Sequence, residues 1–256
     1  MNSRTNNFSP AAFDMTQKPA TRENSAEGLS PCAACAVRDL SLCNVLDEDE
    51  LSMLASIVTS LEVPARAPII DEGESADYLF NVTGGAVKLF KLLADGRRQI
   101  TGFLFPGDFL GIAMNETYAY SAEAVSPVKL CRFPRAKLEN MLDRFPHLEK
   151  RLLGMASNEL AQAQDQMLLL GRKTAKEKLC SFLVSLARRA ERRGDEPGPI
   201  YVPMSRADIG DYLGLTTETV SRTFTNLKRD GIIRLREGGM VEIPDFDHLE
   251  ELADGI

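Results

Sequence analysis

The sequence predicts an α+β fold, with an N-terminal antiparallel β-roll or jelly roll, a long dimerisation helix and a C-terminal winged helix-turn-helix. Three observations support this prediction. Short apolar runs separated by glycine-rich turns fill residues 61–134. A helix with a heptad pattern follows them, and two short capped helices flanking a Gly214-Leu215 turn occupy residues 205–229.

The first segment, residues 1–30, is rich in Asn, Ser, Thr, Pro and Ala and has few large apolar side chains. This composition predicts a disordered leader. The segment lacks the apolar core of a secretory signal, and the chain has no run of about 18 apolar residues that would span a membrane. We therefore expect a cytoplasmic protein with no membrane partner, in a reducing compartment where structural disulfides are rare.

Residues 31–60 combine a cysteine stretch with a short helix. Cys32, Cys35 and Cys43 follow the spacing C-x2-C-x7-C, and apolar residues recur at helical spacing over residues 47–60. Thiolates spaced this closely bind zinc, iron–sulfur clusters or cuprous ion, or they form disulfides. The reducing compartment and the odd total of five cysteines favour a metal or a cluster. The spacing alone does not distinguish between the two.

The β domain is expected over residues 61–134. Residues 78–82, 86–92 and 128–133 have the composition of strands, and turn signals such as Gly84-Gly85 and Pro106-Gly107-Asp108 separate them. Cys131 lies in the last of these strands. Many short strands with glycine-rich turns are typical of an antiparallel barrel or jelly roll.

Residues 135–171 are expected to form a short helix, Arg135–Arg144, and a long one from Pro146 to about Leu170. Apolar residues of the long helix alternate steps of three and four, as in a coiled-coil seam. These are Leu153, Ala156, Leu160, Ala163, Met167 and Leu170. The helix could instead pack only on its own β domain. Its small alanines and polar flanks favour a parallel homodimer.

The last segment, residues 172–250, carries the basic charge of the chain. Residues 171–236 have a net charge of +6. Because the whole chain has a net charge of −7, the remaining residues carry −13. A basic module on an acidic partner domain is the charge distribution of a DNA-binding protein, although a solvated basic helix face would give the same count. The helix Lys173–Arg193 precedes the helix-turn-helix, and we expect its Cys180 to be an ordinary core residue.

Helix-turn-helix signals are concentrated in residues 205–229. Ser205 and Asp208 form a capping box, Gly214 supplies the turn, and Thr216 caps the second helix. At roughly 100° per residue, the second helix places its apolar residues on one side and a polar arc on the other. The apolar side carries Val220, Phe224 and Leu227, and the polar arc carries Glu218, Ser221, Arg222 and Thr225.

The polar arc has the chemistry of a base-reading surface. Arg suits guanine O6 and N7, and Glu accepts from cytosine N4. Plain solvation of the helix is the alternative. A hairpin of residues 231–236 and 240–243 would form the wing, whose arginines reach phosphates. The candidate DNA-contacting residues are Thr217, Glu218, Ser221, Arg222, Thr225 and Arg234.

This order of domains, with Glu218-Thr219-Val220-Ser221-Arg222 in the second helix, resembles the CRP/FNR family of bacterial transcription regulators over residues 32–245. The element E-x-x-S-R together with residues 209–215 resembles the oxygen-responsive FNR branch. The resemblance implies a regulator rather than an enzyme, a homodimer on double-stranded DNA, an inverted repeat of TTGAT-like half-sites, and RNA polymerase as a partner.

The founding branch of that family binds cAMP through a Glu and an Arg–Ser pair. Here the corresponding region offers Asp108 and Ser121, but no Arg precedes Ser121. A phosphodiester buried without a cation is unfavourable, so we expect no cAMP. Both histidines, His147 and His248, lie outside the β domain, so no haem is expected either.

The resemblance instead implies an oxygen-labile [4Fe–4S] cluster, with Cys32, Cys35, Cys43 and Cys131 as its ligands. A buried strand residue is the alternative for Cys131. One rival function is a regulator of the same fold that senses a small molecule and holds structural zinc. The other is a thiol–disulfide redox protein using Cys32 and Cys35, although the βαβ context of such proteins is missing.

Overall fold

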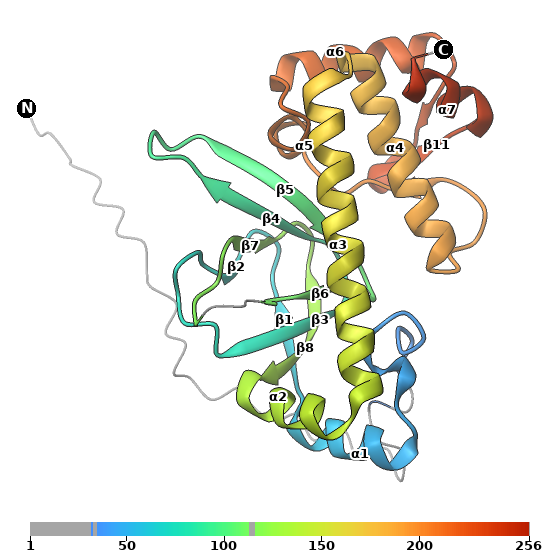
Figure 1. The fold of residues 1–256 in the computed structure, drawn as a ribbon. Helices are drawn as coiled ribbons and strands as arrows, with labels where there is room; N and C mark the ends of the chain where they lie inside the picture. Colours follow the sequence, from blue (N-terminus) through green and yellow to red (C-terminus); the bar gives the residue numbers. More distant parts are fainter. Residues whose placement is uncertain (1–31, 33–34, 113–115, 256) are drawn as a thin grey trace, which may run out of the picture.

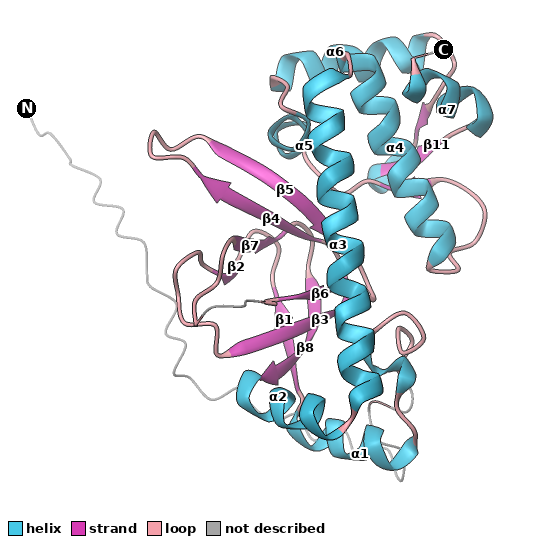
Figure 2. Ribbon diagram, in the orientation of Figure 1, coloured by secondary structure: helices cyan, strands magenta, loops and turns pink. Residues whose placement is uncertain are grey.

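The computed structural model describes residues 32, 35–112 and 116–255. A β domain lies beside one long helix, α3 (Pro146–Arg172), and a helical domain lies at the far end of that helix (Figure 1). Most strands gather in the β domain, whereas helices dominate the C-terminal end (Figure 2). The predicted leader, residues 1–30, falls outside the described residues.

The β domain consists of two four-stranded antiparallel sheets, which confirms the predicted β-roll. One sheet has the order β1–β8–β3–β6 and the other β2–β7–β4–β5. The strands are β1 Thr59–Val63, β2 Pro68–Ile70, β3 Tyr78–Gly84, β4 Val87–Leu92, β5 Arg98–Leu104, β6 Phe109–Leu110, β7 Ser121–Ala124 and β8 Val128–Pro134.

The two faces of strand β8 belong to different apolar cores. Val128 and Leu130 are buried in a cluster that draws side chains from both sheets. Phe133 and the partly buried Cys131 contact a second cluster instead. Because successive side chains of a strand point to opposite faces, the sheet presents Cys131 on its outer face rather than in the roll.

The second cluster lies where the cysteine stretch meets the helices. It contains residues of the 3-10 segment η1 (Leu42–Val45), of α1 (Glu48–Ile57), of α2 (Arg135–Arg144) and of the start of α3. The helix expected over residues 47–60 is shorter than predicted. It ends at Ile57, because Thr59 and Ser60 pair with Arg132 and Cys131 of β8 and so begin strand β1.

Helix α3 begins at the predicted Pro146 and leaves much of its apolar seam uncovered. Leu153, Leu160 and Met167 are each more than 60% exposed in the isolated chain. Ala163 is also exposed, whereas Ala156 and Leu170 are half-buried. The β-roll therefore covers only part of the seam, and an exposed apolar row of this kind is unfavourable in water.

The C-terminal domain confirms the predicted winged helix-turn-helix. Its elements are α4 Ala175–Arg192, β9 Ile200–Tyr201, α5 Arg206–Leu213, α6 Thr217–Arg229, β10 Arg234–Leu235, β11 Met240–Glu242 and α7 Phe246–Asp254. Strands β10, β11 and β9 form one small sheet. The sequence reasoning did not identify β9 or α7. Cys180 is fully buried in the core of this domain, as expected.

The β-roll and the C-terminal domain share an apolar contact. Phe103 of β5 packs against Phe182 of α4 and Tyr212 of α5, with ring centroids 6.1 and 5.1 Å apart.

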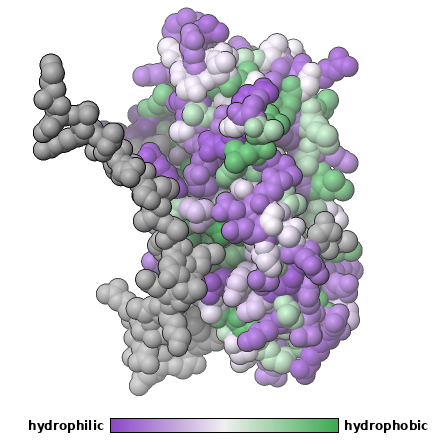
Figure 3. Space-filling model, turned by 90° about the vertical axis from the view of Figure 1, so that its left-hand side faces the viewer, coloured by the Kyte–Doolittle hydropathy of each residue, from purple (hydrophilic) through white to green (hydrophobic). Residues whose placement is uncertain are grey.

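Hydrophilic and hydrophobic residues are interspersed on the molecular face seen in Figure 3. Within the described part of the chain, no helix is both long and apolar enough to cross a membrane.

Candidate metal centre and nucleic-acid interface

Four of the five cysteines approach one another at the outer face of the β-roll. Cys43 lies in η1, and Cys131 lies in β8 directly opposite Ser60 of β1 and Asn81 of β3. Cys32, Cys43 and Cys131 all pack against the second apolar cluster. Cys131, distant in sequence, therefore lies in the same region as the N-terminal three, and its role as a ligand stays a prediction.

The thiols are close enough to influence one another electrostatically. Burial raises the pKa of Cys131 to about 12, and the negative charges of Cys32, Cys35 and Cys43 contribute to the increase. Burial also raises the pKa of Cys43, with Cys32 and Cys35 adding to it and the hydroxyl of Ser41 opposing it. Four neighbouring thiolates are thus unfavourable unless a bound cation compensates their charge.

A buried asparagine whose side-chain oxygen lacks a hydrogen bond lies beside Cys131. Asn81 is 2% exposed, and its Oδ1 has no partner among the described residues. Its Cβ and that of Cys131 are cross-strand neighbours on the same face, which places them about 5 Å apart. A buried acceptor without a partner costs about 1–3 kcal/mol, so this oxygen is suited to a hydrogen-bond donor at the cysteines.

The donor set therefore fits a thiolate-bound metal group. Four cysteines match the usual ligand number of iron–sulfur clusters and of structural zinc. Among the described residues, no three His, Cys, Asp or Glu side chains are grouped closely enough to hold a single metal ion. The thiols and Asn81 identify the place of the site and its donor chemistry.

The cysteine loop is fixed between the β-roll and α3. Arg151 of α3 donates to the carbonyl oxygens of Leu40 and Ser41, at 2.9 and 3.4 Å. Leu40 also lies against Gly107, where an added Cβ would come within 2.6 Å of the Leu40 Cβ. Gly107 has φ +98°, so both its backbone conformation and this contact require glycine.

The residue after Gly107 contacts the C-terminal domain. The Asp108 carboxylate accepts a hydrogen bond from the backbone N–H of Phe105 at 2.7 Å and forms an ion pair with Arg189 of α4. Arg189 also donates to the Phe103 carbonyl at 2.9 Å. Leu40, Gly107, Asp108, Arg151 and Arg189 all line one cavity of about 430 Å³. One turn of the β-roll therefore contacts both the cysteine loop and the C-terminal domain.

The helix-turn-helix is built by the predicted caps. The Ser205 hydroxyl accepts from the Asp208 N–H at 3.0 Å, and the Asp208 carboxylate accepts from the Ser205 N–H at 3.2 Å. Gly214 ends α5 with φ +63°, and Thr216 accepts from the Thr219 N–H at 3.1 Å. These bonds fix where α6 begins and hence which residues it exposes.

The two sides of α6 match the sequence analysis. Val220, Phe224 and Leu227 are buried, and so is Thr223, which the sequence reasoning did not identify. The residues of the opposite face are exposed, namely Thr217, Glu218, Ser221, Arg222 and Thr225. Among the described residues, the side chains of Glu218 and Arg222 have no hydrogen-bond or ion-pair partner, so both are available to a ligand.

The wing arginines are engaged within the wing. Arg234 forms an ion pair with Glu242 at 2.8 Å, and Arg236 binds the same carboxylate. Hydrogen bonds from Arg236 and Arg234 lower the pKa of Glu242. Arg234 is still 59% exposed in its side chain, so it can reach a phosphate while it shares the acid.

The positions associated with cAMP have partners inside the protein. Asp108 is paired with Arg189, and the Ser121 hydroxyl accepts from the Glu72 N–H at 3.0 Å. The expectation that cAMP does not bind stays a prediction.

Several residues at these sites carried no local sequence signal. Asn81, Arg151 and Arg189 each have ordinary neighbours in sequence, and their contacts come from elements far along the chain. By contrast, the E-x-x-S-R element and the cysteine spacing both carry a local signal, although the spacing alone does not distinguish a metal from a cluster.

Two family models match the chain, and both agree with this architecture. The model described as a Crp-like helix-turn-helix domain covers residues 177–252, and the one described as a cyclic nucleotide-binding domain covers residues 60–145. The second match concerns the β-roll.

The relatives are regulators of similar length. The nitrogen fixation regulation protein FixK of Bradyrhizobium diazoefficiens is 40% identical, covering 87% of this chain and 93% of its own. The transcriptional activator FnrL of Cereibacter sphaeroides is 39% identical, covering 88% and 92%. The activator Anr of Pseudomonas aeruginosa is 35% identical, covering 88% and 93%.

A solved structure shows the same arrangement. FixK2 from Bradyrhizobium japonicum superposes with a TM-score of 0.72 at 38% identity, over 77% of this chain and 97% of that one. Relatives, family models and fold agree, and they set aside the thiol–disulfide enzyme. The chain belongs to the CRP/FNR family of DNA-binding transcription regulators.

Proposed function

We propose that the chain is an oxygen-responsive transcription regulator whose DNA binding depends on a [4Fe–4S] cluster held by Cys32, Cys35, Cys43 and Cys131. The observation that carries the proposal is that Cys131, distant in sequence, lies near enough to Cys32, Cys35 and Cys43 for their charges to raise its pKa, at the apolar cluster that Cys32 and Cys43 also contact. Relatives named FnrL and Anr are transcriptional activators, and a regulator of this family would act on RNA polymerase at its promoters.

When bound, such a cluster would supply thiolate–iron bonds that dioxygen destroys, and with them the link between the cysteine loop and β8. The protein groups around it have separate tasks. The buried Asn81 Oδ1, which has no partner among the described residues, can accept a hydrogen bond only from a donor brought to the site. Arg151 holds the loop against α3 through two backbone carbonyls.

The proposed control is thermodynamic. Ligation of the four cysteines would stabilise the contacts of the cysteine loop with Arg151 and Gly107. It would thereby favour the position of α3 seen in this structure. Loss of ligation releases the loop and lowers the population of that arrangement. A coupling of about 1–3 kcal/mol is typical of linkage between two sites.

Replacing one ligand tests the site. Anaerobically purified wild-type protein is expected to absorb visible light and to contain iron and acid-labile sulfide, whereas Cys131→Ser should lose most of both. Cys180→Ser is the matched control, because Cys180 is fully buried in another core, and it should retain the cluster. Iron and sulfide analysis with absorption spectroscopy measures the outcome.

Colourless wild-type protein that contains zinc would contradict the cluster and support the rival regulator, with structural zinc and a small-molecule effector. Equal iron in Cys131→Ser and wild type would show that Cys131 is not a ligand.

We also propose that the exposed face of α6 reads TTGAT-like half-sites in the major groove. Glu218, Ser221 and Arg222 lie on this face near the start of the helix, where recognition helices approach base edges. In this proposal, Thr217, Thr225 and the wing residue Arg234 would contact the adjacent DNA backbone. The support is exposure and chemistry, since Arg222 has no partner among the residues that the structure describes and its guanidinium suits guanine.

Arg222→Ala should weaken binding to a duplex with two inverted TTGAT half-sites by about 1–3 kcal/mol and leave nonspecific binding unchanged. Arg229→Ala is the control, since this exposed arginine lies at the far end of α6 and pairs with Asp230. Fluorescence anisotropy with operator and scrambled duplexes measures both affinities. An equal loss on both duplexes would contradict base reading by Arg222.

We propose further that α3 pairs with α3 of a second copy in parallel. The seam proposed for this contact consists of Leu153, Ala156, Leu160, Ala163, Met167 and Leu170, and its exposed leucines support the proposal. A dimer presents two recognition helices, which matches an inverted repeat with half-sites about one helical turn apart.

A charge in the seam should prevent this pairing. Leu160→Lys is expected to weaken self-association at least about tenfold, because an uncompensated ammonium in an apolar interface is costly. Leu93→Lys is the control, since Leu93 is also exposed but lies in the β4–β5 hairpin. Sedimentation equilibrium of anaerobic protein gives the association constants. A Leu160→Lys dimer as stable as wild type would rule out the seam.

A further inference from the structure

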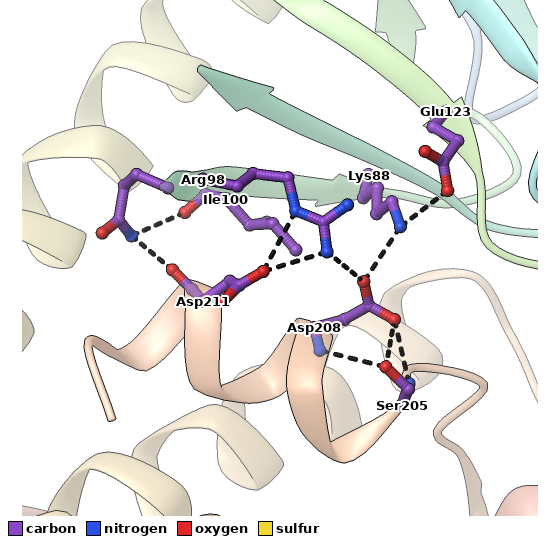
Figure 4. A network of polar contacts seen from close by, with 8 residues as sticks. Lys88, Arg98, Ile100, Glu123, Ser205, Asp208 and Asp211 are labelled. Carbon is purple, nitrogen blue, oxygen red and sulfur yellow. Dashed lines mark hydrogen bonds and ion pairs between the residues drawn. The ribbon is translucent and has the colours of Figure 1, made fainter. Parts of the chain in front are cut away.

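The β4–β5 hairpin of the β-roll holds helix α5 through a network of ion pairs (Figure 4). Lys88 of β4 lies 2.9 Å from a carboxylate oxygen of Asp208. Arg98 of β5 lies 2.9 Å from Asp211 and 3.2 Å from Asp208. The two acids occupy one side of α5, so two cations of the β-roll meet two anions of the helix-turn-helix.

Burial makes this network selective for one geometry. The side chains of Lys88 and Asp208 are only 7% and 11% exposed, and Lys88 also pairs with Glu123 at 2.7 Å. Burial alone would raise the pKa of Asp208, but hydrogen bonds from Ser205 and Lys88 and the Lys88 charge outweigh it and lower the pKa. Buried ion pairs of this kind add little net stability, and they disfavour any arrangement that separates them.

Two amide side chains secure the end of the same helix. Gln99 of β5 donates to the Asp211 carbonyl at 2.6 Å, and Gln166 of α3 donates to the Tyr212 carbonyl at 2.7 Å. These carbonyls belong to the last turn of α5, where the helix itself leaves acceptors free. Donors from the β-roll and from α3 thus fix the backbone of α5 as well as its acids.

Helix α6 follows α5 rigidly. Gly210 of α5 lies so close to the turn that an added Cβ would come within 2.7 Å of the Leu215 carbonyl oxygen. The contacts to the β-roll involve α5 and leave the polar face of α6 exposed. A fixed α5 therefore sets the direction in which the recognition helix points without covering it.

We propose that Arg98 and Lys88 are positioning residues for operator binding: through Asp211 and Asp208 they hold each recognition helix at the orientation that two half-sites require together. The inference rests on the dimeric, two-half-site binding proposed above. A dimer held in this way engages its second half-site at a high effective concentration, which orientational freedom would lower. Binding to a single half-site does not depend on the relative orientation of the two recognition helices.

The test reverses the Arg98–Asp211 pair, since Asp208 also caps α5. The probes are a duplex that wild-type protein selects from a random-sequence pool and the same duplex with one half-site scrambled. Arg98→Asp and Asp211→Arg should each lower affinity for the full site about tenfold or more. Affinity for the single half-site should stay within about twofold of wild type, and combining the two substitutions should restore most of the full-site affinity.

Arg97→Asp is the matched control. It makes the same charge change in the same hairpin, but Arg97 pairs with Asp95 and is largely exposed, so full-site binding should be unchanged. Thermal unfolding checks that each variant is folded. Arg98→Asp binding as tightly as wild type would overturn the inference, as would tighter binding, equal loss on both duplexes, or no recovery on charge reversal.

The sequence that wild-type protein selects from the pool distinguishes a failure of two-half-site binding from a failure of this inference. A selected site without an inverted repeat overturns two-half-site binding and this inference with it. An inverted repeat that Arg98→Asp binds as tightly as wild type overturns the inference alone.

Discussion

The contact of Leu40 with Gly107 is the constraint on which the proposed switch depends. Only a residue without a Cβ fits at this turn, and its positive φ has the same requirement. The loop that carries the cysteines can therefore lie directly on the β-roll. The next residue of the turn, Asp108, pairs with Arg189 of the C-terminal domain. A displacement of the loop at Gly107 would therefore occur next to Asp108, the residue that contacts the C-terminal domain.

The rest of the molecule limits what such a displacement can do. Arg151 ties the loop to α3, whose exposed leucines are the proposed dimer contact. The hairpin network around Asp208 and the Phe103–Tyr212 packing keep the recognition helix fixed relative to the β-roll. In the proposed switch, a signal at the cysteines would therefore act on α3 and its dimer contact, while the recognition helix stays fixed on the β-roll.

The elements with local signals were predictable from sequence. Capping residues fixed both helices of the helix-turn-helix, and the heptad pattern identified α3 and its exposed seam. Long-range pairing was not predictable: Thr59 and Ser60 join a strand because β8 lies beside them, and β9 is too short to show a pattern. Arg151 and Arg98 were missed for the same reason, since the partners of both lie on distant elements, and Asn81 faces Cys131 only because β3 pairs with β8. The meeting of Cys131 with the N-terminal cysteines required the family resemblance.

Operator affinity of one sample before and after exposure to air tests the central claim most directly. Protein purified without oxygen should bind a duplex with two inverted TTGAT half-sites tightly. The same sample, after air has bleached its visible absorption, should bind roughly 5- to 150-fold more weakly, as a coupling of about 1–3 kcal/mol requires. Unchanged affinity after complete bleaching would contradict the account, because the cysteines would then not control DNA binding.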